Sequence, residues 1–196
     1  MDFSQIELRC LAGMSHDSTM LDAYATGKDL HQMTADAGRV IRAHGKTFNF
    51  AMIYGAGDMQ LRRKTKVSFE NIKLMRQGWN SLYPQAKAFI DKLYYYHGPY
   101  VETDFGRRMA MPRNITNMSR HAYEAHCSKA AVNYPIQGTA ADIIKRAMLQ
   151  TKDLDIRVQV HDELVADGEC EFPDSLSHIH PEIHTPFSVY KDYSWK

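Results

Sequence analysis

Apolar residues recur at helical spacing along most of this chain, and polar residues fill the positions between them. Residues three or four apart share one face of a helix, so this is the pattern of amphipathic helices. Asp, Ser or Pro stands near the start of several segments, as is typical of helix N-termini. The pattern predicts helices over 17–24, 30–40, 42–54, 68–82, 84–95, 119–132 and 138–151. Pro135 is expected to interrupt the helical structure between the last two.

Short strands are predicted where brief apolar runs are bounded by turn residues. His161 and Asp162 occupy one such tight connection, and the tail from Phe172 onward is expected to hold loops and one edge strand. This mixture predicts an α+β fold that is predominantly helical. The paired runs predict antiparallel strands 100–103 with 109–111, and 157–160 with 163–166.

The predicted helix 42–54 carries cations and aromatic rings at every fourth position. Successive members of the series Arg42, Lys46, Phe50 and Tyr54 drift by only about 40°, so the four share one broad face. Gly45 lies inside this helix and is expected to weaken it by roughly 1 kcal/mol relative to Ala.

Composition and charge narrow the function classes. The 196 residues suit one domain, or one medium domain with a small one, and 44% hydrophobic residues permit a packed core. No apolar run approaches the roughly 18 residues of a membrane span, and the first residues do not resemble a signal peptide. Net charge is +1, but residues 39–76 carry nine Lys or Arg against two acids, whereas residues 153–171 carry seven acids against one Arg. This opposition suits a site for a polyanion and metals, although two ordinary solvated faces are the alternative.

The three cysteines, Cys10, Cys127 and Cys170, lack CxxC spacing. An odd number of cysteines cannot pair completely, which favours a reducing cytoplasm. No zinc site is expected, because no Cys and His residues stand at ligand spacing.

Five segments resemble motifs of the family A DNA polymerases, which include bacterial DNA polymerase I and phage relatives. The segment from Asp2 to Arg9 resembles the first catalytic motif, the series from Arg42 to Gly55 resembles the fingers-helix motif, and Val160-His161-Asp162-Glu163 resembles the third motif. Residues 100–108 and 133–142 also resemble that family. The five occur in family order and cover most of the chain.

The resemblance implies polymerase fingers helices packed on a partial antiparallel palm sheet. Residues 1–30 and 100–196 would form the partial palm and 31–99 the fingers, with thumb and exonuclease domains absent. The implied activity is template-directed 5′→3′ DNA synthesis from dNTPs, in the cytoplasm of a bacterium or a phage-infected host. We expect a fragment that needs an N-terminal complement and is weakly active or inactive alone, because Asp2 would be poorly fixed and duplex binding incomplete.

Asp2 and Asp162 are the candidate metal ligands. Attack of a primer oxygen on an α-phosphate can be assisted by two metals about 4 Å apart. Mg²⁺ suits such a site, because it takes a few carboxylates and completes its shell with substrate phosphates; Mn²⁺ is the alternative. The resemblance adds the Phe3 carbonyl as a ligand. An isolated Asp is more often a helix cap or turn residue.

Three basic residues are candidates for the incoming triphosphate. Arg42 suits bidentate phosphate contact and Lys46 a point contact, and Lys46 could also protonate the leaving group. The resemblance implies that His31 contacts the triphosphate. A lone His is otherwise more often a surface or capped residue.

The resemblance also assigns roles around the base and the sugar. Phe50 would stack near the nucleotide, Tyr54 would lie at the nascent pair, and Glu7 would block a ribose 2′-hydroxyl. The alternatives are ordinary core aromatics and a solvent-exposed helix acid.

Contacts with primer-template DNA are implied for six polar residues. Asn and Gln amides can donate to minor-groove acceptors that every correct base pair offers. The arginines would contact the phosphate backbone or simply lie on the surface. The candidates are Lys129, Asn133, Gln137, His161, Arg107 and Arg108.

Two other readings stay open. One is a single-subunit RNA polymerase, which Glu7 argues against, because a residue that excludes the 2′-hydroxyl would prevent RNA synthesis. The other is a catalytically weak or dead nucleic-acid-binding fragment, which would bind DNA in a salt-dependent way without turnover.

Overall fold

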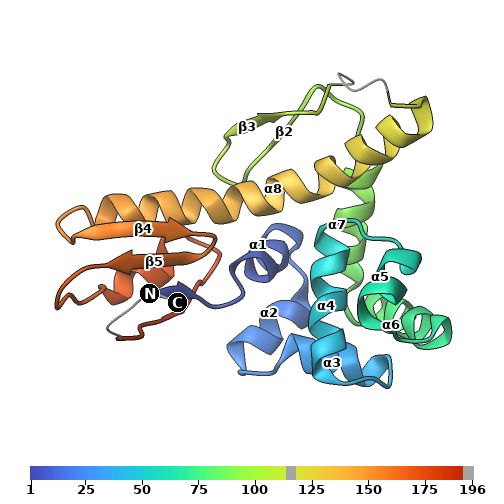
Figure 1. Cartoon of the computed structure of the whole chain (residues 1–196), viewed down its shortest axis with the longest axis horizontal. Helices are drawn as coiled ribbons and strands as arrows, with labels where there is room; N and C mark the ends of the chain where they lie inside the picture. The colour runs from blue at the N-terminus through green and yellow to red at the C-terminus, as the bar shows by residue number, and fades with distance from the viewer. Residues whose placement is uncertain (114–117, 192–196) are drawn as a thin grey trace.

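The computed structural model describes residues 1–113 and 118–191 (Figure 1). Within these residues the helices are α1 (Ile6–Ser15), α2 (Ser18–Ala25), α3 (Leu30–Ala37), α4 (Arg42–Ile53), α5 (Asp58–Thr65), α6 (Phe69–Leu82), α7 (Pro84–Tyr94) and α8 (Arg120–Gln150). The strands are β1 (Asp2–Phe3), β2 (Tyr100–Glu102), β3 (Arg108–Ala110), β4 (Ile156–Val160), β5 (Glu163–Ala166) and β6 (Phe187–Ser188), with a 3₁₀ helix η1 (Asp174–His178). The predicted α+β, predominantly helical class is confirmed.

The main sheet is antiparallel and has the strand order β4-β5-β1-β6. Asp2 pairs with Glu163 of β5 on one side and with Ser188 of β6 on the other. The amino group of Met1 is buried and donates to the Leu164 carbonyl at 2.9 Å. The expectation that Asp2 is poorly fixed is therefore wrong, because its strand is internal to the sheet.

The predicted hairpins and edge strand are confirmed. β4 and β5 flank the turn at His161, whose backbone adopts the left-handed conformation with φ 51°. β2 and β3 form a separate two-stranded sheet. In the tail, β6 takes the edge position beside β1.

Helix α8 runs the length of the molecule, between the β2–β3 hairpin on one side and α1 on the other (Figure 1). The predicted break at Pro135 is wrong, because Pro135 lies buried inside this one helix. A proline inside a helix removes one backbone bond and costs about 3 kcal/mol. Burial of Ala131, Val132 and Ile136 around it offsets that cost.

Helix α5 was not predicted. Leu61 is its buried residue, and Arg62, Arg63 and Lys64 are exposed. With so little apolar surface the segment lacks a visible period, and it is held by the packing of Leu61 into the core. In the part of the chain described here, no helix combines the length and the apolar character that crossing a membrane requires.

One hydrophobic core joins the sheet to the helices. Phe3 and Leu164 reach it from the sheet, and Phe48 and Trp79 from α4 and α6. Each of these side chains is at most 1% exposed. The core therefore fixes helix α4 relative to the sheet that carries Asp2.

Helices α3 and α4 approach each other closely at Gly45. A Cβ at this position would lie 2.2 Å from the His31 carbonyl oxygen and 2.9 Å from Ala35. The position therefore requires glycine for the approach of two backbones, which the sequence pattern presented only as a weak point in a helix.

Replacing Gly45 by Ala is expected to destabilise the protein by about 1–3 kcal/mol, because the added methyl overpacks the contact with α3. Helix propensity alone predicts the opposite sign, a gain of about 1 kcal/mol. Urea denaturation measures the difference. Ala88→Gly, on the exposed face of α7, is the control for helix propensity, and it should lower the free energy of unfolding by about 1 kcal/mol. A Gly45→Ala protein that is more stable than the unmodified chain would contradict the close approach of α3 and α4.

Candidate functional site

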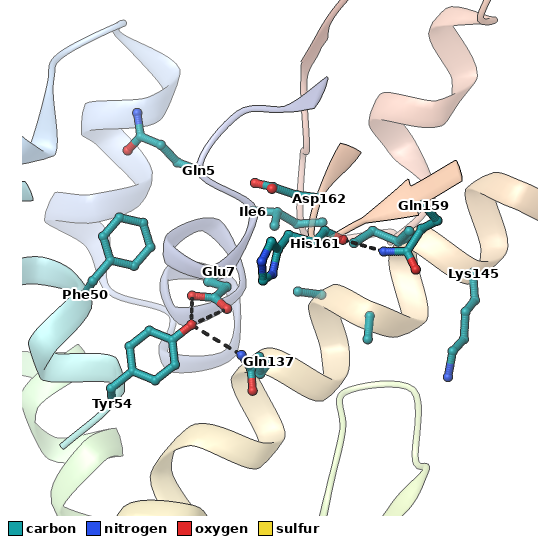
Figure 2. A pocket seen from close by; sticks show the side chains of 13 residues that line it. Gln5, Ile6, Glu7, Phe50, Tyr54, Gln137, Lys145, Gln159, His161 and Asp162 are labelled. Carbon is teal, nitrogen blue, oxygen red and sulfur yellow. Dashed lines mark hydrogen bonds between the residues drawn. The ribbon is translucent and has the colours of Figure 1, made fainter. Parts of the chain in front are cut away.

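A cavity of about 460 Å³ opens where α1, α4, α8 and the β4–β5 turn meet. Figure 2 shows side chains from these separate elements pointing into the same space. Its lining includes Glu7, Phe50, Tyr54, Gln137, His161 and Asp162. Residues predicted from separate motifs are thus brought together at one site.

Asp162 lines the cavity at its sheet end, and Asp2 lies on the neighbouring strand without being among the lining residues. The Phe3 backbone N–H donates to the Asp162 carbonyl at 3.0 Å, so the two acidic segments are in direct contact. Burial raises the pKa of the Asp2 carboxyl, and the charges of Asp162 and Glu163 raise it further. The N-terminal ammonium and Lys46 oppose that shift. Negative charge therefore accumulates at this end of the cavity.

The donor set fits a divalent cation with oxygen ligands. Two carboxylates in close reach would be relieved of their mutual repulsion by such an ion. Across residues 1–113 and 118–191, no three His, Cys, Asp or Glu side chains converge as a complete metal cage. A small divalent cation such as Mg²⁺ commonly keeps waters and substrate phosphates beside one or two carboxylates.

A hydrogen-bonded bridge crosses the cavity from α4 to α1 and α8. The Tyr54 hydroxyl donates to both Glu7 carboxylate oxygens, at 2.8 and 3.0 Å, and accepts from Gln137 Nε2 at 3.3 Å (Figure 2). Burial raises the pKa of Glu7, and the bonds from Tyr54 and Gln137 act against that shift. Burial, followed by the bond to Glu7, raises the pKa of Tyr54.

The cationic end of the site lies along α4. Arg42 and Lys46 are exposed, and Arg42 forms an ion pair with Asp29, the residue that caps α3. His31 is buried beneath them, and its ring lies 6.0 Å from that of Phe50. Burial lowers the pKa of His31 to about 4; Asp29 opposes this shift, and Arg42 and Lys46 add to it. His31 is therefore neutral at neutral pH.

The other predicted DNA contacts are placed differently. Lys129 and Asn133 precede Gln137 at four-residue spacing on α8, and Lys129 packs where Gly55 ends α4. Neither is among the residues that line the cavity.

The two predicted arginines are held by partners within the chain. Arg107 Nε pairs with Asp142 at 2.7 Å, and Arg108 pairs with Glu102 at 3.0 Å. Neither lines the cavity. Arg107 thus ties the β2–β3 hairpin to α8, whereas Arg108 stays within the hairpin.

Sequence reasoning missed three polar residues of the lining, Gln5, Lys145 and Gln159. Lys145 stands eight residues beyond Gln137 in α8, a helical spacing that could have indicated the shared face. Gln5 and Gln159 gave no such signal, because they reach the cavity only through the placement of α1 and β4.

The chain is similar in sequence to proteins of one family. A family model described as "DNA polymerase family A" matches residues 1–184. The chain is 31% identical over 200 residues to "DNA polymerase I, thermostable" of Thermus aquaticus, a match that covers 93% of the chain and 24% of that protein. It is 33% identical over 172 residues to "DNA polymerase" of Mycobacterium phage L5, covering 85% of the chain and 27% of that protein.

A solved structure is also similar. It is described as the POL domain of Pol1 from M. smegmatis in complex with DNA primer-template and dNTP, and it matches with a TM-score of 0.77 and 28% identity. The match covers 94% of this chain and 37% of that one. The chain thus spans about a quarter of the length of the curated relatives named above.

Replacing Tyr54 by Phe is expected to raise the pKa of Glu7 further above its ordinary value. The hydroxyl stabilises the charged carboxylate, so its loss leaves burial less opposed. A ¹³C titration of the labelled Glu7 carboxyl measures the shift. Tyr95→Phe removes an exposed hydroxyl from the end of α7 and should leave Glu7 unchanged; an unchanged or lower Glu7 pKa in Tyr54→Phe would refute the bridge.

Proposed function

The chain belongs to DNA polymerase family A, and from this premise we propose that it performs template-directed DNA synthesis, adding dNTPs in the 5′→3′ direction by a two-metal mechanism. One observation supports the proposal above all: the pairing of β1 with β5 brings Asp2 beside Asp162. Lys46 of α4 lies close enough to lower the pKa of the Asp2 carboxyl. An acidic pair and a basic side chain thus lie within electrostatic reach of each other beside the cavity that Asp162 lines, as nucleotidyl transfer requires.

The acidic end would hold the metals. Asp2, Asp162 and the Phe3 carbonyl are the proposed ligands, with Mg²⁺ as the metal and Mn²⁺ as the alternative. When bound, two such ions would help to activate the primer 3′-oxygen and stabilise the leaving pyrophosphate. The protein's own contribution is rigidity, because β1 is fixed on both edges before any ligand arrives.

The cationic end would hold the triphosphate. Arg42 and Lys46 offer charged donors on one exposed face of α4, and a positioned ammonium at Lys46 could deliver a proton to the leaving group. Desolvation strengthens such contacts when a substrate fills the cavity. His31 would add an uncharged donor from beneath.

The bridge across the cavity would select the sugar and the base pair. Glu7 is held by Tyr54 at a fixed place in the cavity, where it would exclude a ribose 2′-hydroxyl. Phe50 lines the same space and would stack on the nucleotide. Gln137 and His161 would contact the primer-template beside it.

The wider assembly is part of the proposal. Residues 31–99 would act as fingers, and residues 1–30 and 100–196 as part of a palm. Primer-template DNA and dNTPs would be the partners, supported by the similarity to M. smegmatis Pol1 in its complex with primer-template and dNTP. An N-terminal polymerase fragment would add duplex contacts, and a cytoplasmic location stays a prediction.

Replacing Asp162 by Ala should lower the primer-extension rate by about a thousandfold or more, because several kcal/mol of charge stabilisation at the reacting phosphate are lost. The rate is measured with Mg²⁺, in the chain alone or in the assembly that shows activity. Asp167→Asn, which changes an exposed acid of the same region, should retain the rate. A loss below tenfold would remove Asp162 from the metal site, and DNA binding without any turnover would favour the non-catalytic alternative.

Replacing Glu7 by Ala should increase the use of rNTPs relative to dNTPs by at least about tenfold, because the obstacle to the 2′-hydroxyl is removed. The ratio of incorporation efficiencies for one matched base measures this effect and cancels general losses of activity. Glu70→Ala on α6 is the surface control. Equal use of both sugars by the unmodified protein would instead support the RNA polymerase alternative.

A further inference from the structure

A buried chain of hydrogen bonds links α3 to α4 near the exposed cations Arg42 and Lys46. Thr34 Oγ1 donates to Asn49 Oδ1 at 2.8 Å. Asn49 Nδ2 lies 3.3 Å from the Leu30 carbonyl and 3.0 Å from His31 Nδ1. Thr34, Asn49 and His31 are each at most 1% exposed.

The chemistry of these partners fixes the direction of every bond. The Leu30 carbonyl can only accept, so the NH₂ side of the Asn49 amide must face it. The same NH₂ group faces His31, and an N–H cannot bond to another N–H. His31 Nδ1 must therefore accept, which leaves the imidazole proton on Nε2.

His31 Nε2 is the open end of this chain. It is buried and has no hydrogen-bond partner among the described residues. A buried N–H without an acceptor is unfavourable, and native proteins rarely retain one without a reason. The exposed cations Arg42 and Lys46 lie close enough to lower the pKa of His31. Their positive charge would favour an anionic acceptor at Nε2.

We propose that Asn49 is a positioning residue that holds His31 as the neutral Nε2–H tautomer, presenting one uncharged donor to a phosphate of the incoming nucleotide. This inference rests on the proposed function, because the phosphate is that of a dNTP. Thr34 holds the amide in turn. The Phe50 ring lies beside His31, with the ring centroids 6.0 Å apart.

A neutral donor suits this position. Three charged groups act on His31: Asp29 favours protonation, whereas Arg42 and Lys46 oppose it. A protonated imidazole would add a third positive charge beside two cations, and the wrong neutral tautomer would aim a lone pair at the phosphate. The Asn49 amide excludes both states without adding a charge of its own.

The first test reads the tautomer directly. Long-range ¹H–¹⁵N spectra of the labelled full chain report the protonation of each imidazole nitrogen, and His31→Gln identifies the His31 signal among the ten histidines. We expect a bare Nδ1 and a protonated Nε2 between about pH 8 and about pH 5. A proton on Nδ1, or a charged ring at neutral pH, would overturn the proposal.

Asn49→Asp reverses one bond at nearly constant shape. A carboxylate can only accept, so His31 Nδ1 must then donate, and the His31 pKa should rise above its ordinary value of about 6.5. Thr47→Asp is the matched control, because it adds the same charge to α4 at a residue whose hydroxyl donates to the Ala43 carbonyl. Thr47→Asp should keep the Nε2–H tautomer of His31. A change of tautomer in Thr47→Asp, or no change in Asn49→Asp, would count against the proposed role of Asn49.

Titration with dTTP and Mg²⁺ tests the phosphate contact. Above the raised pKa, Asn49→Asp presents a lone pair at Nε2 and should bind dTTP about tenfold more weakly than the unmodified chain. Below that pKa the Nε2 proton returns, so the ratio of the two affinities should recover. A constant ratio would refute the phosphate contact. If the unmodified chain shows the expected tautomer but does not bind dTTP, the positioning of His31 by Asn49 is supported and the proposed function fails.

Discussion

The insertion of β1 between β5 and β6 is the constraint on which the rest of the site depends. A strand this short contributes little stability by itself. It is nevertheless hydrogen-bonded on both edges, and the side chain of its second residue, Phe3, is buried in the core. Its register places Asp2 opposite Glu163 and beside the left-handed turn at His161. A slip of one residue would turn the Asp2 side chain to the other face of the sheet.

Electrostatic contrast follows from this arrangement. Burial, and then the charges of Asp162 and Glu163, raise the pKa of Asp2, whereas the N-terminal ammonium and Lys46 of α4 lower it. A folded protein tolerates such an accumulation of like charge where a ligand balances it, and sites of this kind are commonly functional. Tyr54 and Glu7 span the cavity, so the helix that carries Arg42 and Lys46 is tied to the helix that follows β1.

Close packing of α3 on α4 fixes the helix that carries Arg42 and Lys46. The missing side chain at Gly45 lets the two backbones meet, and the Thr34–Asn49–His31 chain of hydrogen bonds lies in the same interface. A glycine that weakens an isolated helix thus contributes to the packing of a pair of helices. The tautomer of a buried imidazole is set by the same contact, because the amide that faces it has only one permitted orientation.

Local sequence determined most of the helices, the β4–β5 turn and the residue types of the site, because periodicity, capping and turn chemistry act over a few neighbours. It did not determine that α8 continues through Pro135, that Leu61 anchors a helix, or that Gln5 and Gln159 reach the cavity. Only the tertiary structure decided these, since burial and strand register join residues far apart in the chain and outweigh local preference. The proximity of Asp2 to Asp162 depends on both the sequence and the tertiary structure. The motifs predicted it, and the pairing of β1 with β5 brings the two segments together.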